Sequence, residues 1–158
     1  MLEGDAGQPG LFVGDEAPEA AVPRALIVRR PWADMIASGV KRWEIRGTST
    51  SLRGPMAIAA AGSGTIVGVC SLAGVLGPLT AEEYQEAWRL WGGAEGTQGP
   101  LPYLRTYAWV LTQARPLDPP IPYRHPAGAV IWVKLNREVQ ACIRRALGPD
   151  RTASEGRG

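Results

Sequence analysis

The sequence predicts an α+β fold, a small and mostly antiparallel β-barrel with about three flanking helices. Segments with strand composition outnumber helical segments, and the two types alternate too sparsely for a doubly wound parallel sheet. The 158 residues, of which 45% are hydrophobic and 20% charged, suit one domain with its own core. The chain has no internal repeat and no GxGxxG motif, so neither a repeat fold nor a dinucleotide-binding fold is indicated.

The predicted domain begins with a strand, a helix and a second strand. Ala25–Val28 is a short apolar run, as in a buried strand. Pro31–Ser38 predicts a helix, because proline suits the first turn and Gly39 suits the position just past the end. In Arg42–Arg46 apolar residues alternate with charged ones, which predicts a strand with one apolar and one charged face.

The middle of the chain predicts two strands and a second helix. A turn at Arg53-Gly54-Pro55 leads into an apolar strand, Met56–Ala60. Thr65–Ala73 is rich in small and β-branched residues and predicts a buried strand that contains Gly68. The capping-box pattern Thr80-Ala81-Glu82-Glu83 opens a helix.

Two strands and a closing helix complete the predicted domain. Tyr107–Leu111 and Ala129–Leu135 have strand composition, and Arg137–Leu147 predicts the helix. The tryptophans of these two strands, Trp109 and Trp132, are expected in the core.

Tails flank the predicted domain, which spans residues 23–148. Residues 1–22 are acidic and rich in glycine, proline and alanine, and residues 149–158 are polar, so both are expected to be disordered. The apolar trio Leu11-Phe12-Val13 is a candidate site for docking on the domain or on a protein partner. No apolar run approaches the roughly 20 residues that cross a bilayer, and no basic residue precedes Arg24. We therefore expect a cytoplasmic protein without a membrane partner.

The charge distribution favours a nucleic-acid partner. Residues 1–23 hold five acidic and no basic residues, which leaves 17 basic against 10 acidic residues and a net charge of +7 over 24–158. Of the 17 basic residues 15 are arginine, whose planar fork binds phosphate and stacks on flat rings. An arginine-biased genome explains the same composition equally well.

Cysteine and histidine are too few to suggest metal chemistry. The chain holds Cys70, Cys142 and one histidine, His125, with no CxxC or HxxxH pair. A zinc site is therefore not expected, nor is any other metal or cofactor. His125 lies in a proline-rich loop, which gives no sign of a catalytic triad.

The first helix and second strand carry motifs that resemble the activating-signal-cointegrator homology (ASCH) family. The motifs are Arg30-Pro31-Trp32-Ala33, then Gly39-Val40-Lys41-Arg42-Trp43-Glu44-Ile45-Arg46, then Arg53-Gly54-Pro55. The resemblance extends over residues 25–135 and implies a barrel of the pseudouridine synthase and archaeosine transglycosylase (PUA) type. It also implies a cleft floored by residues 41–46 that binds RNA or single-stranded DNA.

The resemblance also implies an alternative function, that of a small hydrolase. One branch of the family resembles an amidohydrolase of N4-acylcytidine, and another is a metal-dependent single-strand ribonuclease. In an enzyme, Lys41 and Glu44 would be the catalytic pair. The amidohydrolase branch has threonine at the position of Glu44, so this chain lacks the nucleophile of that branch.

The expected nucleic-acid-binding residues are Arg30, Trp32, Lys41, Glu44, Arg46 and Arg53. Each also has a purely structural explanation. Lys41 binds phosphate, or it is a solvated turn lysine. Glu44 accepts a hydrogen bond from a base, or it only pairs with a neighbouring arginine. Trp32 stacks on a base, or it packs its helix on the barrel. A nucleotide that is modified or flipped out of its stack is a candidate ligand.

Overall fold

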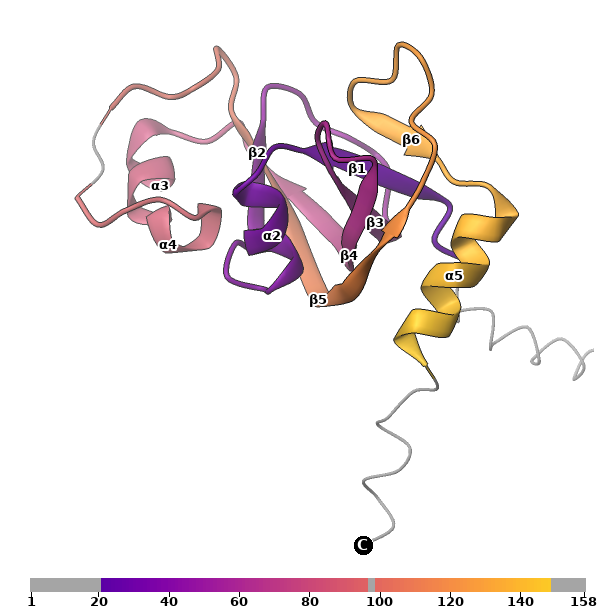
Figure 1. Cartoon of the computed structure of the whole chain (residues 1–158). Coiled ribbons are helices and arrows are strands. Elements are labelled where there is room, and N and C mark those ends of the chain that lie inside the picture. Colours follow the sequence, from indigo (N-terminus) through magenta and orange to yellow (C-terminus); the bar gives the residue numbers. More distant parts are fainter. Residues whose placement is uncertain (1–20, 97–98, 149–158) are drawn as a thin grey trace, which may run out of the picture.

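The computed structural model of the chain describes residues 21–96 and 99–148 (Figure 1). Its elements in chain order are β1 (Arg24–Val28), α2 (Trp32–Ala37), β2 (Trp43–Arg46), β3 (Gly54–Ala60), β4 (Thr65–Leu76), α3 (Ala81–Glu86), α4 (Trp88–Trp91), β5 (Tyr107–Pro122), β6 (Trp132–Lys134) and α5 (Arg137–Leu147). Of the predicted tails, residues 1–20 and 149–158 lie outside the described residues. Val22, which the prediction placed at the end of the first tail, is buried.

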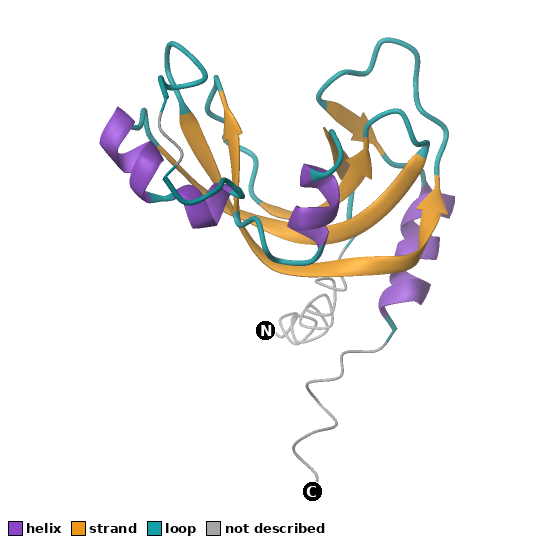
Figure 2. Ribbon diagram, turned by 60° about the vertical axis from the view of Figure 1, so that its left-hand side comes forward, coloured by secondary structure: helices purple, strands orange, loops and turns teal. Residues whose placement is uncertain are grey.

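The strands form one six-stranded sheet in the order β2-β5-β4-β3-β1-β6. Neighbours are antiparallel except β1 and β3, which run parallel. Figure 2 shows the sheet curled into an open half-barrel. The edge strands β2 and β6 each pair with one neighbour only, so an open side remains between them. The predicted α+β fold with a mostly antiparallel, barrel-like sheet is confirmed.

Apolar side chains are buried on both faces of the curled sheet. Alternate residues of β3 point to opposite faces, as strand geometry requires: Met56 and Ile58 join the core around α2, whereas Ala57 and Ala59 join the core around α5. Helix α2 lies in the hollow of the sheet and α5 packs on its outer side (Figures 1 and 2). Because α2 lies inside the hollow, the segment that follows it runs directly to the open side of the half-barrel.

A glycine in β4 allows α2 to approach the sheet closely. A Cβ built on Gly68 would lie 2.6 Å from the Cβ of Ala37 and 2.9 Å from the carbonyl oxygen of Arg115. Both distances are shorter than a normal van der Waals contact, so any side chain at this position would push the helix or β5 outward.

Gly68→Ala is therefore expected to lower the free energy of unfolding by about 1–3 kcal/mol, the usual cost of overpacking. Gly74→Ala in the same strand is the matched control, since a Cβ there meets nothing within 4 Å. Urea unfolding of both variants measures the difference. Equal stability of the two variants would contradict the packing argument.

The structure corrects the predicted extent of β5. The strand was expected to end at Leu111, but it continues to Pro122 through four prolines. Strand β2 pairs with β5 only over Tyr107–Val110, so beyond that point one edge of β5 has no strand partner. Proline is tolerated at such an edge because no ladder hydrogen bond is lost there. Leu117 and Ile121 remain buried, which keeps the second half of the strand on the core.

Two other boundaries also differ from the prediction. The capping box is present, with the Thr80 side chain accepting from Glu83 N–H, but the helix is interrupted at Ala87 and splits into α3 and α4. Strand β6 is confined to Trp132–Lys134, shorter than the predicted Ala129–Leu135. Among the described residues no helix is long and apolar enough to cross a membrane.

Candidate functional site

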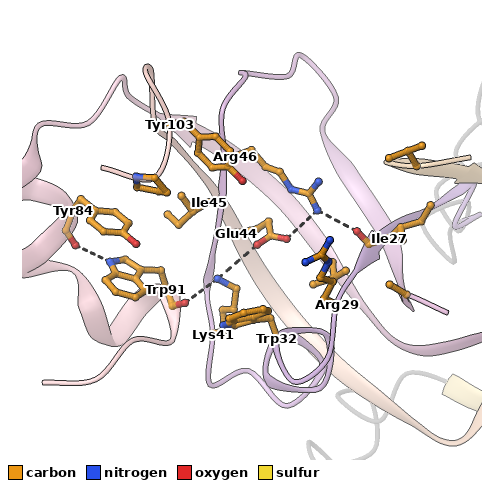
Figure 3. A pocket seen from close by; sticks show the side chains of 14 residues that line it. Ile27, Arg29, Trp32, Lys41, Glu44, Ile45, Arg46, Tyr84, Trp91 and Tyr103 are labelled. Carbon is orange, nitrogen blue, oxygen red and sulfur yellow. Dashed lines mark hydrogen bonds and ion pairs between the residues drawn. The ribbon is translucent and has the colours of Figure 1, made fainter. Parts of the chain in front are cut away.

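A cavity of about 640 Å³ lies on the open side of the half-barrel, between β2 and the end of β1. Figure 3 shows the side chains that line it. They come from the end of β1, from α2, from residues 41–46, from α3 and α4, and from the three loops that carry Ala61, Pro102 with Tyr103, and Val130. The volume falls in the range of about 300–1,000 Å³ that is typical of small-molecule sites.

Lys41 lies at the floor of this cavity and is only 4% exposed. Its ammonium donates hydrogen bonds to the carbonyl oxygens of Trp43, at 2.7 Å, and Trp91, at 2.8 Å. Glu44 Oε1 lies 3.6 Å from the same nitrogen. Three oxygens thus surround an ammonium that has three hydrogens. Lys41 is not a solvated turn lysine, because it joins β2 to α4 and to Glu44.

Glu44 lies between two cations. Its Oε2 accepts a hydrogen bond from Arg46 Nη2 at 3.0 Å, while its Oε1 faces Lys41. The same Arg46 nitrogen donates to the carbonyl oxygen of Ile27 at 3.1 Å, and the guanidinium lies 5.7 Å from the centre of a Trp109 ring. Arg46 therefore bridges the open side of the half-barrel, where β1 and β2 do not pair. The floor carries two positive charges and one negative charge.

Burial determines the protonation behaviour of the floor. Burial lowers the pKa of Lys41 from its ordinary value of 10.5, and the nearby Arg46 acts in the same direction, while Glu44 opposes both. Between the lowered pKa and 10.5, the unfolded chain binds more protons than the folded protein. The contribution of Lys41 to the free energy of unfolding therefore rises with pH across this window. It is lost as the pH drops from 10.5 to below the lowered pKa of Lys41 in the folded protein.

Accordingly, the free energy of unfolding of the wild type relative to Lys41→Met is expected to increase as the pH is raised from neutrality towards 10.5. Urea unfolding over this range measures the slope. Lys134→Met, at the exposed second lysine of the chain, controls for the removal of a lysine elsewhere. A difference between wild type and Lys41→Met that does not change with pH would contradict the assignment.

The backbone of β2 also has a free edge at the cavity. The Arg42 carbonyl accepts from Leu111 N–H at 2.8 Å, so alternate residues beginning at Arg42 bond to β5. Trp43 and Ile45 then face away from β5. The Trp43 carbonyl is taken by Lys41, but among the described residues the backbone groups of Ile45 have no hydrogen-bond partner. Ile45 lines the cavity, so a donor and an acceptor are available there.

Aromatic side chains form the walls. Trp32, 44% exposed, and Tyr103 lie on opposite sides of Glu44 (Figure 3). A third wall is made by Tyr84 and Trp91, whose rings stack with centroids 4.5 Å apart and planes 5° apart. The Trp91 indole N–H donates to the Tyr84 carbonyl at 2.6 Å, which locks the pair. The cavity thus combines a charged floor with flat, partly exposed rings.

The structure brings together four of the residues predicted to bind nucleic acid, namely Trp32, Lys41, Glu44 and Arg46. Arg30 and Arg53 are exposed and do not line the cavity. Arg30 pairs with Asp34, its Nε lying 3.1 Å from Oδ2, and Arg53 donates to the carbonyls of Thr50 and Leu52. Their role in binding stays a prediction.

Sequence reasoning missed part of the lining. Arg29 at the rim and the wall residues Tyr84, Trp91, Tyr103 and Val130 are not among the residues that the sequence predicts for the site. Tyr84 and Trp91 are seven residues apart, a spacing that places both on one face of a helix without showing what that face contacts. The capping box fixed the start of that helix, but nothing in the sequence showed that its aromatic face meets β2.

Metal ligands do not gather anywhere in residues 21–96 and 99–148: no three His, Cys, Asp or Glu side chains lie close enough to hold an ion. His125 lies outside the cavity lining, where its ring nitrogens contact the Tyr123 hydroxyl at 2.8 Å and the Ala129 carbonyl at 2.9 Å. Cys70 is buried, and burial raises the pKa of its thiol to about 12. Neither residue takes part in the candidate site.

Comparison with known proteins gives a family match and a fold match. The model of the family described as ASCH domain matches residues 26–121. The crystal structure of ASCH from Zymomonas mobilis aligns with a TM-score of 0.54 and 17% identity, over 75% of this chain and 90% of that one. Crystal structures of two mutants of that protein also align, each at 16% identity. One mutant has a TM-score of 0.48, over 78% of this chain and 96% of that one. The other has a TM-score of 0.47, over 76% of this chain and 94% of that one. No curated protein matches the sequence.

Proposed function

The chain belongs to the ASCH domain family, and from this premise we propose that it binds nucleic acid, with one nucleotide entering the cavity around Lys41, Glu44 and Arg46. The observation that carries the proposal is the combination of a charged, buried floor with an exposed tryptophan in a cavity of about 640 Å³. Flat rings bind base faces, and charged groups bind base edges and phosphates.

Each part of the cavity has a distinct role in this proposal. Trp32 stacks on the base from one side, since stacking accepts any base. Glu44 accepts a hydrogen bond from an exocyclic amino group, because Oε1 lies 3.6 Å from Lys41, too far to be fully occupied. Arg46 and the exposed Arg29 bind phosphate or a keto group. Lys41 positions Glu44 and α4, because two of its ammonium hydrogens are donated to backbone carbonyls and its charge pairs with Glu44.

The ligand we propose is single-stranded or locally opened, with RNA preferred to DNA on the ground of family membership. A base can present its edge to Glu44 only after it has left its stack, so an unpaired, modified or flipped nucleotide is favoured. Affinity should fall as salt concentration rises, because each phosphate contact releases counterions.

Arg29→Gln is expected to weaken binding of a fluorescein-labelled single-stranded RNA. It should also make the slope of log affinity against log salt concentration shallower by about one, the contribution of one phosphate contact. Arg29 lines the cavity rim and is exposed, so the fold should survive the change. Arg144→Gln on α5, behind the sheet, is the matched control and should bind like wild type. Fluorescence anisotropy titrations at several salt concentrations measure both effects. The proposal fails if no RNA or DNA binds, or if both variants lose affinity equally.

A hydrolase is the second candidate, favoured by one observation: a buried lysine with a lowered pKa lies beside a carboxylate in the same cavity. Such a pair can move a proton. The test is incubation with N4-acetylcytidine and with labelled RNA, each with and without divalent metal. Product that disappears in Lys41→Met supports the enzyme, whereas tight binding without product supports a binding module.

A further inference from the structure

We propose that the acidic N-terminal segment of this chain docks in the same cavity, with Leu11-Phe12-Val13 laid along the free edge of β2, and thereby competes with nucleic acid. The docking itself is independent of the proposed function, whereas the competition rests on it. Three features of the described residues support this occupant: an apolar rim, an unpaired strand edge and an excess of positive charge.

The rim of the cavity carries apolar side chains that are exposed to water when the cavity is empty. Trp32, Tyr103 and Val130 all line the cavity and are 44%, 46% and 75% exposed. They come from α2 and from two separate loops, so they surround the opening. Apolar groups gathered around a cavity mark a binding site more often than isolated exposed groups do.

The strand edge selects an extended peptide as the occupant. The N–H and C=O of Ile45 face the cavity without a partner among the described residues. The free N–H and C=O groups along a strand edge have the same spacing as those of a second extended strand. An extended peptide can therefore add to the sheet by hydrogen bonding to this edge. The edge is short, because Lys41 takes the Trp43 carbonyl and the Tyr103 ring covers the backbone at Gly47. A three-residue apolar segment suits this length.

Charge identifies which peptide fits. The cavity presents Lys41, Arg46 and Arg29 against the single acid Glu44. Residues 1–20 contain Glu3, Asp5, Asp15, Glu16 and Glu19 and no basic residue. The apolar trio stands between the two acidic groups, so apolar and acidic side chains of the segment match the apolar rim and the cationic floor together.

The length of the segment allows the contact within one chain. Phe12 is nine residues before Ala21, where the described part begins, and nine residues span about 30 Å when extended. Ala21 is seven residues before Val28, which lines the cavity, and seven extended residues span about 23 Å. The tether is therefore long enough, and short enough to keep the segment at a high effective concentration near the site.

Amide hydrogen exchange of the full chain tests the docking without any nucleic acid. The Ile45 amide should exchange about tenfold faster when Leu11, Phe12 and Val13 are all replaced by serine. Leu2→Ser changes an apolar residue of the same segment outside the trio and is the control. The Ile45 amide of this variant should exchange at the wild-type rate. Raising the salt concentration should also speed exchange in wild type, because the acids and the cationic floor attract each other less.

Equal exchange at Ile45 in wild type and the triple serine variant overturns the docking. Slower exchange of the Ile45 amide at higher protein concentration also overturns docking within one chain, because a second copy of the protein then supplies the segment. If docking holds and the proposed function is right, the triple serine variant binds single-stranded RNA several-fold more tightly than wild type. Faster exchange with no RNA binding by either protein would retain the docking and refute the proposed function.

Discussion

Glu44→Ala is expected to lower the free energy of unfolding by about 3–5 kcal/mol, the cost of breaking a buried ion pair from one side. The change removes the carboxylate that lies between Lys41 and Arg46 and leaves two cations close together. Lys41 is 4% exposed and Glu44 7%, so water that enters from the cavity replaces only part of the lost interaction. Urea unfolding followed by tryptophan fluorescence measures the loss.

A double-mutant cycle separates this mechanism from a simple loss of packing. If charge is the cause, adding Lys41→Met to Glu44→Ala should restore part of the stability, because one of the two stranded cations is then removed. Glu82→Ala, at an exposed position in the first turn of α3, controls for the loss of a carboxylate and should change stability by less than about 1 kcal/mol. A loss at Glu44 as small as that at Glu82 would contradict the buried ion network.

The local part of the site could be predicted from the sequence. The alternation in residues 42–46 placed Glu44 and Arg46 on one face of a strand, and Gly39 adopts the positive φ of 84° that the helix end requires. The hydrogen bond and ion pair between Glu44 and Arg46 follow from that alternation, because residues two apart share a face. The local geometry of this segment therefore follows from its sequence pattern.

Long-range contacts of the site could not be predicted in this way. Lys41 donates to the carbonyl of Trp91, fifty residues away, and such a bond depends on where α4 lies, not on a local pattern. The break at Ala87 that separates α3 from α4 has no proline or glycine to signal it. Prolines argue against a strand in the interior of a sheet, whereas the unpaired edge of β5 tolerates them.

Trp32→Ala is expected to weaken binding of single-stranded RNA by about 5- to 150-fold, the loss of one base-stacking contact of about 1–3 kcal/mol. The indole is 44% exposed and lines the cavity, so its removal should change the free energy of unfolding far less than it changes affinity. Anisotropy titrations measure the first quantity, and urea unfolding measures the second.

Two further variants decide whether Trp32 acts through its flat ring. Trp32→Phe keeps an aromatic face and should retain much of the affinity, whereas a packing role would not depend on planarity. Leu104→Ala removes a fully exposed apolar side chain that does not line the cavity, and it should leave binding unchanged. A Trp32→Ala protein that binds RNA as wild type does, or that unfolds as readily as Glu44→Ala, would show that the indole only holds α2 in the hollow. The neighbouring residues Ala33 and Ile36 already anchor α2 in the hollow, because both are fully buried in the core there. Under the proposed function, this exposed indole beside a charged cavity is the ring on which a base stacks.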